Sequence, residues 1–219
     1  MNPDTLLTDL NCVVIDVETT GLSKEAKIIE VAAVRLENWQ PTQEFQTLVN
    51  PEMPIPHQST EVHEITDSMV MAAPLFPEIA PGLAHLLQNA VIVGHNLYSF
   101  DKRFLMSHFR SVFGASLDNW AIDTLYLARK LLPDNEHKLE ALSKLFGIPL
   151  VAHYAMSDVY ATAEILLHLV GILQENGWKT LADLEKFKSL KKFEGTGLPH
   201  FKVRPHVPLL PRKTESPNS

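Results

Sequence analysis

Val13 to Gly21 reads Val-Val-Ile-Asp-Val-Glu-Thr-Thr-Gly, an apolar run that leads directly into two carboxylates. The apolar run predicts a buried strand, in which side chains alternate between two faces. Asp16 and Glu18 are therefore expected on one face, about 7 Å apart along the chain. Like charges on a half-buried surface repel unless a cation lies between them. The hard oxygen ligands indicate Mg²⁺ or Mn²⁺, although Asp-x-Glu alone also occurs at solvated strand ends.

Length and composition predict one domain with an extension. The chain has 219 residues, of which 45% are hydrophobic, and this is sufficient for one sizeable core. No apolar run approaches the ~20 residues of a membrane-spanning helix, and residues 1–10 do not resemble a signal peptide. We therefore expect a cytoplasmic protein without a membrane partner. The single cysteine, Cys12, excludes an internal disulfide and a cysteine-rich zinc site.

The net charge of -7 is unevenly distributed along the chain. Residues 180–219 contain eight Lys or Arg and four Asp or Glu, so residues 1–179 contain eleven and twenty-two. An acidic body binds phosphate backbones poorly by itself. If the protein binds nucleic acid, we expect it to do so through metal ions at an acidic site, assisted by the basic end.

The order of the predicted elements is that of an α/β domain. Three strands come first and predict an antiparallel meander: the strand from Val13, 28–36 and 45–49. After short helical turns within 59–70, helices and strands alternate: helix 75–87, strand 90–93, helix 99–113 capped by Ser99, strand 120–122, and helices 124–131, 139–146 and 157–174. This order favours a mixed five-stranded sheet flanked by helices. Ligands of such sheets lie beyond the carboxyl ends of the central strands, where the two carboxylates are expected.

Two further polar stretches, 95–101 and 153–158, lie where helices are predicted to begin. Asp101 and Asp158 fall in first helical turns, where the helix dipole alone favours a carboxylate by ~0.3–1 kcal/mol. His153 lies five residues before Asp158 and outside the helix. It is either an ordinary surface residue or a neighbour of the acids.

These stretches together resemble the DEDDh 3′–5′ exonucleases, a DnaQ-like family that includes the proofreading subunit of bacterial DNA polymerase III. The matching motifs are Asp16-x-Glu18-Thr-Thr-Gly, His95-Asn96 followed by Phe100-Asp101, and His153-x-Ala155-x-x-Asp158. The segments 61–66 and 123–129 are also similar, and the resemblance covers roughly 11–171. It implies a ribonuclease-H-like fold and phosphodiester hydrolysis with two divalent ions.

The resemblance also implies a role for each motif residue. Asp16 would bridge both ions, Glu18 and Asp158 would hold the ion that activates water, and Asp101 would support the second ion. His153 would be the general base, because an imidazole with a pKa near ~6.5 suits proton transfer at neutral pH.

The sequence departs from the family pattern at two places, and the identity of the catalytic residue in the third motif is open to a second interpretation. Three residues, 97–99, separate the His-Asn pair from Phe-Asp where two are usual, and we expect a bulge that leaves Asp101 in place and affects Asn96. Glu64 stands where glycine is common. Tyr154 has the spacing of the catalytic tyrosine in the sister DEDDy group, but His153 and Ala155 match the histidine form. We assign Tyr154 to packing.

Substrate contacts are implied at five positions. Thr19, Gly21 and Leu22 would place backbone and an apolar wedge against the terminal nucleotide, although Leu22 is as readily explained by core packing. His63 contacts a sugar or base, or caps a turn. Asn96 completes the predicted substrate-binding set.

The C-terminal part is predicted to form an amphipathic helix over 180–193 and a Pro-rich tail that is flexible at 211–219. The helix carries apolar residues at steps of three and lysines on other faces. It either docks on the nuclease body or contacts nucleic acid, a polymerase or another replication or repair partner. The predicted domains are 8–175, the exonuclease domain, and 176–219, this extension.

The function predicted from the sequence is metal-dependent 3′–5′ hydrolysis of single-stranded or frayed DNA ends. One alternative is trimming of RNA ends. Another is a non-catalytic module that binds nucleic acid or a polymerase, but the presence of all five expected catalytic residues argues against it.

Overall fold

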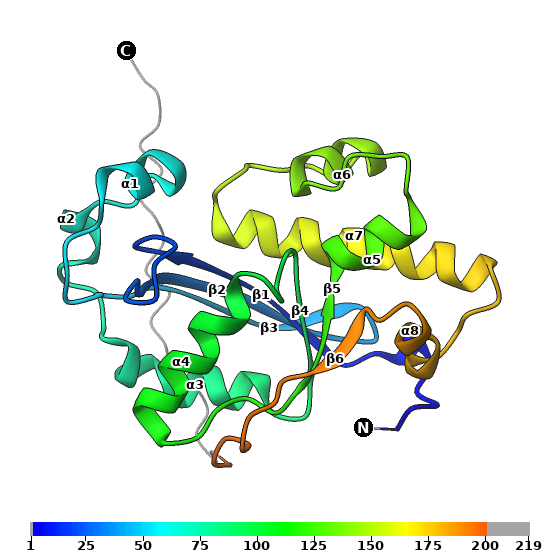
Figure 1. Cartoon of the computed structure of the whole chain (residues 1–219), viewed down its shortest axis with the longest axis horizontal. Coiled ribbons are helices and arrows are strands. Elements are labelled where there is room, and N and C mark those ends of the chain that lie inside the picture. Colours follow the sequence, from blue (N-terminus) through cyan, green and yellow to red (C-terminus); the bar gives the residue numbers. More distant parts are fainter. Residues whose placement is uncertain (1, 201–219) are drawn as a thin grey trace.

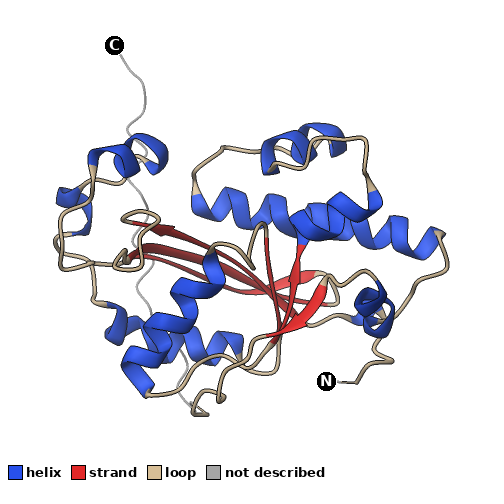
Figure 2. Cartoon of the chain, in the orientation of Figure 1, coloured by secondary structure: helices blue, strands red, loops and turns tan. Residues whose placement is uncertain are grey.

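The computed structural model describes residues 2–200, so the predicted flexible tail at 211–219 lies outside the described residues. A six-stranded mixed sheet forms the centre of the molecule (Figures 1 and 2). Its strands lie in the order β3-β2-β1-β4-β5-β6. Their bounds are β1 Cys12–Thr19, β2 Ile28–Glu37, β3 Gln40–Leu48, β4 Val91–Gly94, β5 Trp120–Asp123 and β6 Leu190–Lys192.

The strand directions confirm the predicted meander followed by parallel strands. β1 pairs antiparallel with β2, and β2 with β3, whereas β4 is parallel to both β1 and β5. The third strand begins earlier than the predicted residue 45, at Gln40, because Asn38 and Trp39 both adopt positive φ (51° and 63°) and form a tight hairpin turn.

Helices cover both faces of the sheet (Figure 1). α3 and α4 lie on one face, and α5, α6 and α7 lie on the other. The helices are η1 Leu7–Asp9, α1 His57–His63, α2 Asp67–Val70, α3 Phe76–Leu87, α4 Asp101–Phe113, α5 Thr124–Leu131, α6 Leu139–Phe146, α7 Ala155–Glu175 and α8 Leu181–Lys186. The predicted fold class is thereby confirmed, with one strand more than expected.

The molecule has a hydrophobic core on each face of the sheet, and side chains of β1 contribute alternately to the two. Val13 and Ile15 pack with buried residues of α3 and α4, whereas Cys12 and Val14 pack with buried residues of α7. The period of two in the sequence is therefore the period at which β1 alternates between its two helical layers. Asp16 continues the series on the α7 side of the sheet.

Contrary to the expectation that no segment approaches a membrane-spanning helix, α7 is long and apolar enough, by length and composition, to cross a membrane. Most of it is buried, and it packs against β1, β2, α5 and α6, so it is a core helix.

The predicted helix over 180–193 is wrong in its second half. α8 ends at Lys186, Lys188 adopts a positive φ of 56°, and β6 then pairs antiparallel with β5. The unpaired edge of β5 offers backbone partners, and a spacing of three does not by itself distinguish a helix from a turn followed by a strand. Leu190 and Phe193 are buried, so the segment docks on the body as predicted. The domain boundary at 175/176 stays a prediction.

The predicted cap of α4 is also wrong. Phe100 occupies the N-cap position and makes no side-chain capping hydrogen bond, while Ser99 lies exposed in the preceding turn. The turn is held from elsewhere in the molecule, as described below.

Candidate active site

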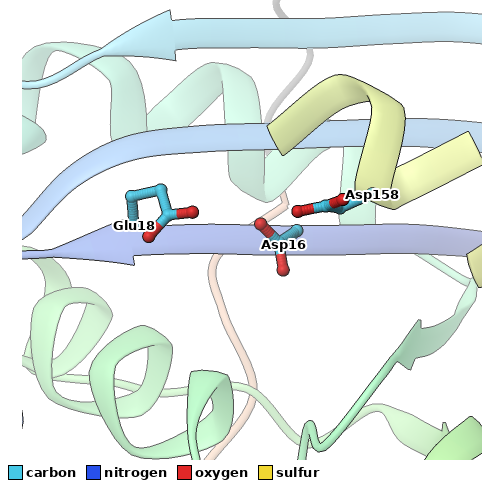
Figure 3. A group of neighbouring side chains, drawn as sticks. All are labelled: Asp16, Glu18 and Asp158. Carbon is cyan, nitrogen blue, oxygen red and sulfur yellow. The ribbon is translucent and has the colours of Figure 1, made fainter. Parts of the chain in front are cut away.

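Three acidic side chains meet at the C-terminal half of β1 (Figure 3). Asp16 and Glu18 project from the same face of β1, and Asp158 projects from the first turn of α7. Each offers a carboxylate oxygen, and these oxygens all lie within 4.8 Å of one another. The structure thus brings together residues that are about 140 positions apart in the sequence.

Asp101 approaches the same site from α4. It is buried at 2% exposure, and its Oδ1 accepts a hydrogen bond of 3.1 Å from the backbone N–H of Val17, the residue between the two β1 acids. Its charge also acts on Asp16. All four predicted acids therefore converge on one region of the fold.

Burial raises the pKa values of three of these acids, and in Asp16 the charges of the other acids add to the effect. Burial and then the charges of Asp101 and Glu18 raise the pKa of Asp16 well above its ordinary value. Burial raises the pKa of Asp101 to about 7 and that of Asp158 to about 6. Because these folded-state pKa values exceed the unfolded value of 3.8, the three groups disfavour folding increasingly as pH rises from about 4 to about 7 in the absence of a cation.

The donor set fits a divalent cation. Oδ1 of Asp158 is buried and has no hydrogen-bond partner among the described residues, and the carboxylate of Asp158 lies beside that of Asp16 (Figure 3). A buried carboxylate oxygen without a partner is costly unless a cation is bound. The four carboxylates offer hard oxygens only, which is the chemistry of Mg²⁺ and Mn²⁺ sites.

A fifth acid, Glu30, was not predicted. It lies on β2 directly opposite Glu18, is 1% exposed, and accepts a hydrogen bond of 3.0 Å from Gln46 Nε2. Its charge contributes to the raised pKa values of Asp16 and Asp158. The available signal was a single glutamate inside the apolar strand Ile28-Ile29-Glu30-Val31.

His153 lies in the loop that precedes α7, with an exposed side chain and a φ of 61°. Its backbone amide and its imidazole both lower the pKa of Asp158, against the larger effect of burial. His153 is thus an electrostatic neighbour of the carboxylates. Tyr154 is partly buried and packs against the α7 core, in agreement with its assignment to packing.

A largely apolar pocket of about 670 Å³ adjoins the acids. It is lined by four of the five residues predicted to bind substrate: Thr19, Gly21, Leu22 and His63. Leu22 is 73% exposed, which excludes core packing as its role. The remaining lining residues include Glu18, Met53, Val62 and Phe100.

The structure explains two residues at the end of α1, His63 in the pocket wall and its neighbour Glu64. His63 is buried and its Nδ1 accepts a hydrogen bond from the N–H of Ile65, so its ring is fixed at the pocket. Glu64 adopts a φ of 61° at the end of α1, the left-handed conformation that glycine adopts most readily. Its side chain is exposed, so the departure from glycine costs backbone strain and adds no group to the core.

Asn96 is not among the residues that line this pocket. It has a φ of 67°, and its backbone organises the turn before α4: its N–H donates to Asp123 Oδ1 (3.1 Å) and its carbonyl accepts from Ser99 and Phe100. Asp123 was predicted only as part of the family-like segment 123–129, without a role of its own; in the structure it caps α5 and also holds this turn.

The fold and the site together define a nuclease of the DnaQ-like class, with acids from β1, α4 and α7 at the carboxyl ends of the central strands. The chain belongs to the exonuclease family, whose model matches residues 13–166. This membership makes the chain an exonuclease and confirms the resemblance that the motifs indicated.

Relatives agree with this assignment. The chain is 37% identical over 194 residues to a PolC-type DNA polymerase III of Caldanaerobacter subterraneus subsp. tengcongensis, with 87% of this chain and 14% of the relative covered. It is 38% identical over 185 residues to a DNA polymerase III subunit epsilon-like protein of Rhodobacter capsulatus, with 81% and 26% covered. The chain therefore spans about a quarter or less of the length of these two relatives.

Solved structures give the same fold. Exonuclease X, in a complex with 5′ overhanging duplex DNA, is 29% identical with a TM-score of 0.62, over 80% of this chain and 99% of that one. Exonuclease I of E. coli, in a complex with a dT13 oligonucleotide, is 21% identical with a TM-score of 0.66, over 77% and 42%, and shows the fold alone.

Proposed function

We propose that this chain removes nucleotides from the 3′ ends of single-stranded or frayed DNA by hydrolysis that depends on two divalent ions, Mg²⁺ or Mn²⁺. The observation that carries the proposal is the cluster of Asp16, Glu18 and Asp158, whose oxygens lie within 4.8 Å of one another inside an exonuclease-family domain. Asp101 completes the set of ligands.

The role proposed for each residue follows from the position of its side chain. The four carboxylates hold the ions, which when bound would stabilise the attacking and leaving oxygens of the phosphodiester. His153, exposed beside Asp158, takes the proton of the attacking water. Leu22 and Phe100 in the apolar pocket contact the terminal nucleotide, and Thr19, Gly21 and His63 shape the wall behind it.

The direct test uses 5′-labelled single-stranded DNA with Mg²⁺ or Mn²⁺. Removal from the 3′ end produces a ladder of labelled products that shorten one nucleotide at a time. Release of the labelled nucleotide as the first product would contradict the direction. An RNA of the same sequence is the matched control, and faster degradation of the RNA would overturn the choice of DNA. No degradation of either would overturn the proposed catalysis.

We also propose a setting for this activity. Relatives named as DNA polymerase III proteins support a place in replication or repair in the cytoplasm, with a polymerase as partner. The apolar residues of 181–193 are used by the fold, since Leu181, Leu184, Leu190 and Phe193 are buried. A partner at this segment would therefore meet its exposed lysines.

Metal binding should stabilise the protein more at pH 8 than at pH 5. At pH 5 the three carboxyl groups with raised pKa values carry protons that a cation must displace. The Mn²⁺ concentration is the same at both pH values and is about 100 times the dissociation constant measured at pH 8. We expect it to raise the melting temperature by about 5–10 °C at pH 8 and by much less at pH 5. Thermal scans at both pH values check this, with Ca²⁺-free and Mn²⁺-free buffer as reference. Equal shifts at the two pH values would contradict the assignment of these acids.

A further inference from the structure

The turn that delivers Asp101 contains the motif insert, residues 97–99, and this insert is bonded to a part of the chain outside the family match. Tyr98 is the bonded residue. Its hydroxyl lies 2.6 Å from the carbonyl oxygen of Ala121 on β5 and 2.7 Å from that of Ser189, directly before β6. The family match ends at residue 166, so Ser189 lies beyond it.

The contact with the C-terminal segment is built from several groups. Ser189 is fully buried, and its own hydroxyl donates to the carbonyl of Leu184 in α8. The ammonium of Lys191 lies 4.6 Å from the centre of the Tyr98 ring. Burial raises the pKa of Tyr98, so its hydroxyl remains protonated and can donate at neutral pH.

The backbone of the insert is bonded to Asp123 and to the first turn of α4. The backbone N–H of Tyr98 donates to Asp123 Oδ2 (3.0 Å), and the carbonyl of Leu97 accepts from Lys102 in the first turn of α4 (3.0 Å). Leu97 is fully buried. α4 begins at Asp101 with no side-chain cap, so these contacts, rather than a cap, set where its first carboxylate lies.

We propose that Tyr98 is a positioning residue, through which β5 and the C-terminal strand β6 hold Asp101 at the place where it supports a divalent ion. The proposal rests on the proposed function for the role of Asp101. It explains why the extra residue of the insert leaves Asp101 directed at Val17: the added length is taken up by a tyrosine that is held at both its backbone and its hydroxyl.

The test is Tyr98→Phe, which keeps the ring and removes the hydroxyl. We expect the weaker of the two Mn²⁺-binding steps in calorimetry to lose about tenfold in affinity, as loss of a group that orients a ligand does. With DNA as substrate, the Mg²⁺ concentration for half-maximal activity should rise and kcat should fall by about the same factor, with KM for the oligonucleotide within about twofold.

The matched control is Tyr160→Phe. Tyr160 lies on α7, and its hydroxyl donates to Glu44 of β3. This variant loses a tyrosine hydrogen bond of the same kind on the helix that carries Asp158, and it should retain wild-type Mn²⁺ affinity and kcat. A merely structural role for Tyr98 would lower the melting temperature in both variants and change Mn²⁺ binding in neither; that result would overturn the proposal.

A double-mutant cycle tests the link to β6. Leu190→Ala removes a buried anchor of this strand. In the Leu190→Ala background, Tyr98→Phe should change Mn²⁺ affinity by less than about threefold, because the two substitutions act on one contact. Full additivity would remove β6 from the proposal. Because Mn²⁺ binding is measured without substrate, a wild-type chain that binds Mn²⁺ but degrades no DNA would overturn the proposed function and still decide the role of Tyr98.

Discussion

Asp16→Asn is expected to lower the rate of DNA degradation by about a thousandfold or more, because one carboxylate charge is removed where two ions would share it. Asp16 occupies the centre of the cluster: its pKa responds to the charges of Asp101, Glu18, Asp158 and Glu30. Single-turnover assays with Mg²⁺ on a 5′-labelled oligonucleotide measure the loss.

We do not expect unfolding to cause this loss of activity, and the melting temperature of the variant tests this. The metal-free wild-type protein ionises Asp16 at pH 8 against burial and like charges, whereas asparagine carries no charge. Metal-free Asp16→Asn should therefore melt at or above the wild-type temperature at pH 8. Asp9→Asn, an exposed acid before the opposite end of β1, is the matched control and should keep full activity. Activity near wild type in Asp16→Asn would remove Asp16 from the mechanism.

His153→Ala is expected to lower kcat by about 10²–10⁴-fold, the usual contribution of a general base. The imidazole is exposed and is not one of the carboxylates that would hold the ions, so its removal should leave the fold and Mn²⁺ binding intact. Pre-steady-state rates measure the chemical step, and Mn²⁺ titration checks the ligands.

Two comparisons make the assignment of the base specific. His168→Ala removes an exposed histidine from the far part of α7, where its ring stacks on Phe146, and should leave kcat unchanged. Tyr154→Phe removes the hydroxyl of the neighbouring residue and should also retain activity. A loss of less than about tenfold in His153→Ala, with a large loss in Tyr154→Phe, would transfer the role to the tyrosine.

Local patterns predicted most of the site because each acid follows a local signal. Asp16 and Glu18 end an apolar strand, and Asp158 and Asp101 lie in first helical turns. The structure brings these acids together. Their catalytic roles, like that of His153, stay proposals with the tests above.

For Glu30 and Asp123 the local signal was too weak to indicate a role at the site. Glu30 looks like an ordinary strand residue until the pairing of β1 with β2 sets it opposite Glu18. Asp123 reads as a helix cap, and only the parallel pairing of β4 with β5 places its carboxylate under the turn at 96–98. The pairing partners are far away in sequence, so no window along the chain contains the information.

The sequence by itself determined the class of fold, the placement of the carboxylates at element ends and the family, because periodicity and short motifs are local properties. Tertiary structure decided that residues 190–192 form a strand, because the free edge of β5 offered backbone partners that outweighed a helical spacing of apolar residues. It also decided that Leu22 is exposed beside the pocket. It also decided what holds Asp101 in place. Backbone hydrogen bonds to a distant strand and burial against distant helices depend on the whole chain, and neither can be read from neighbouring residues.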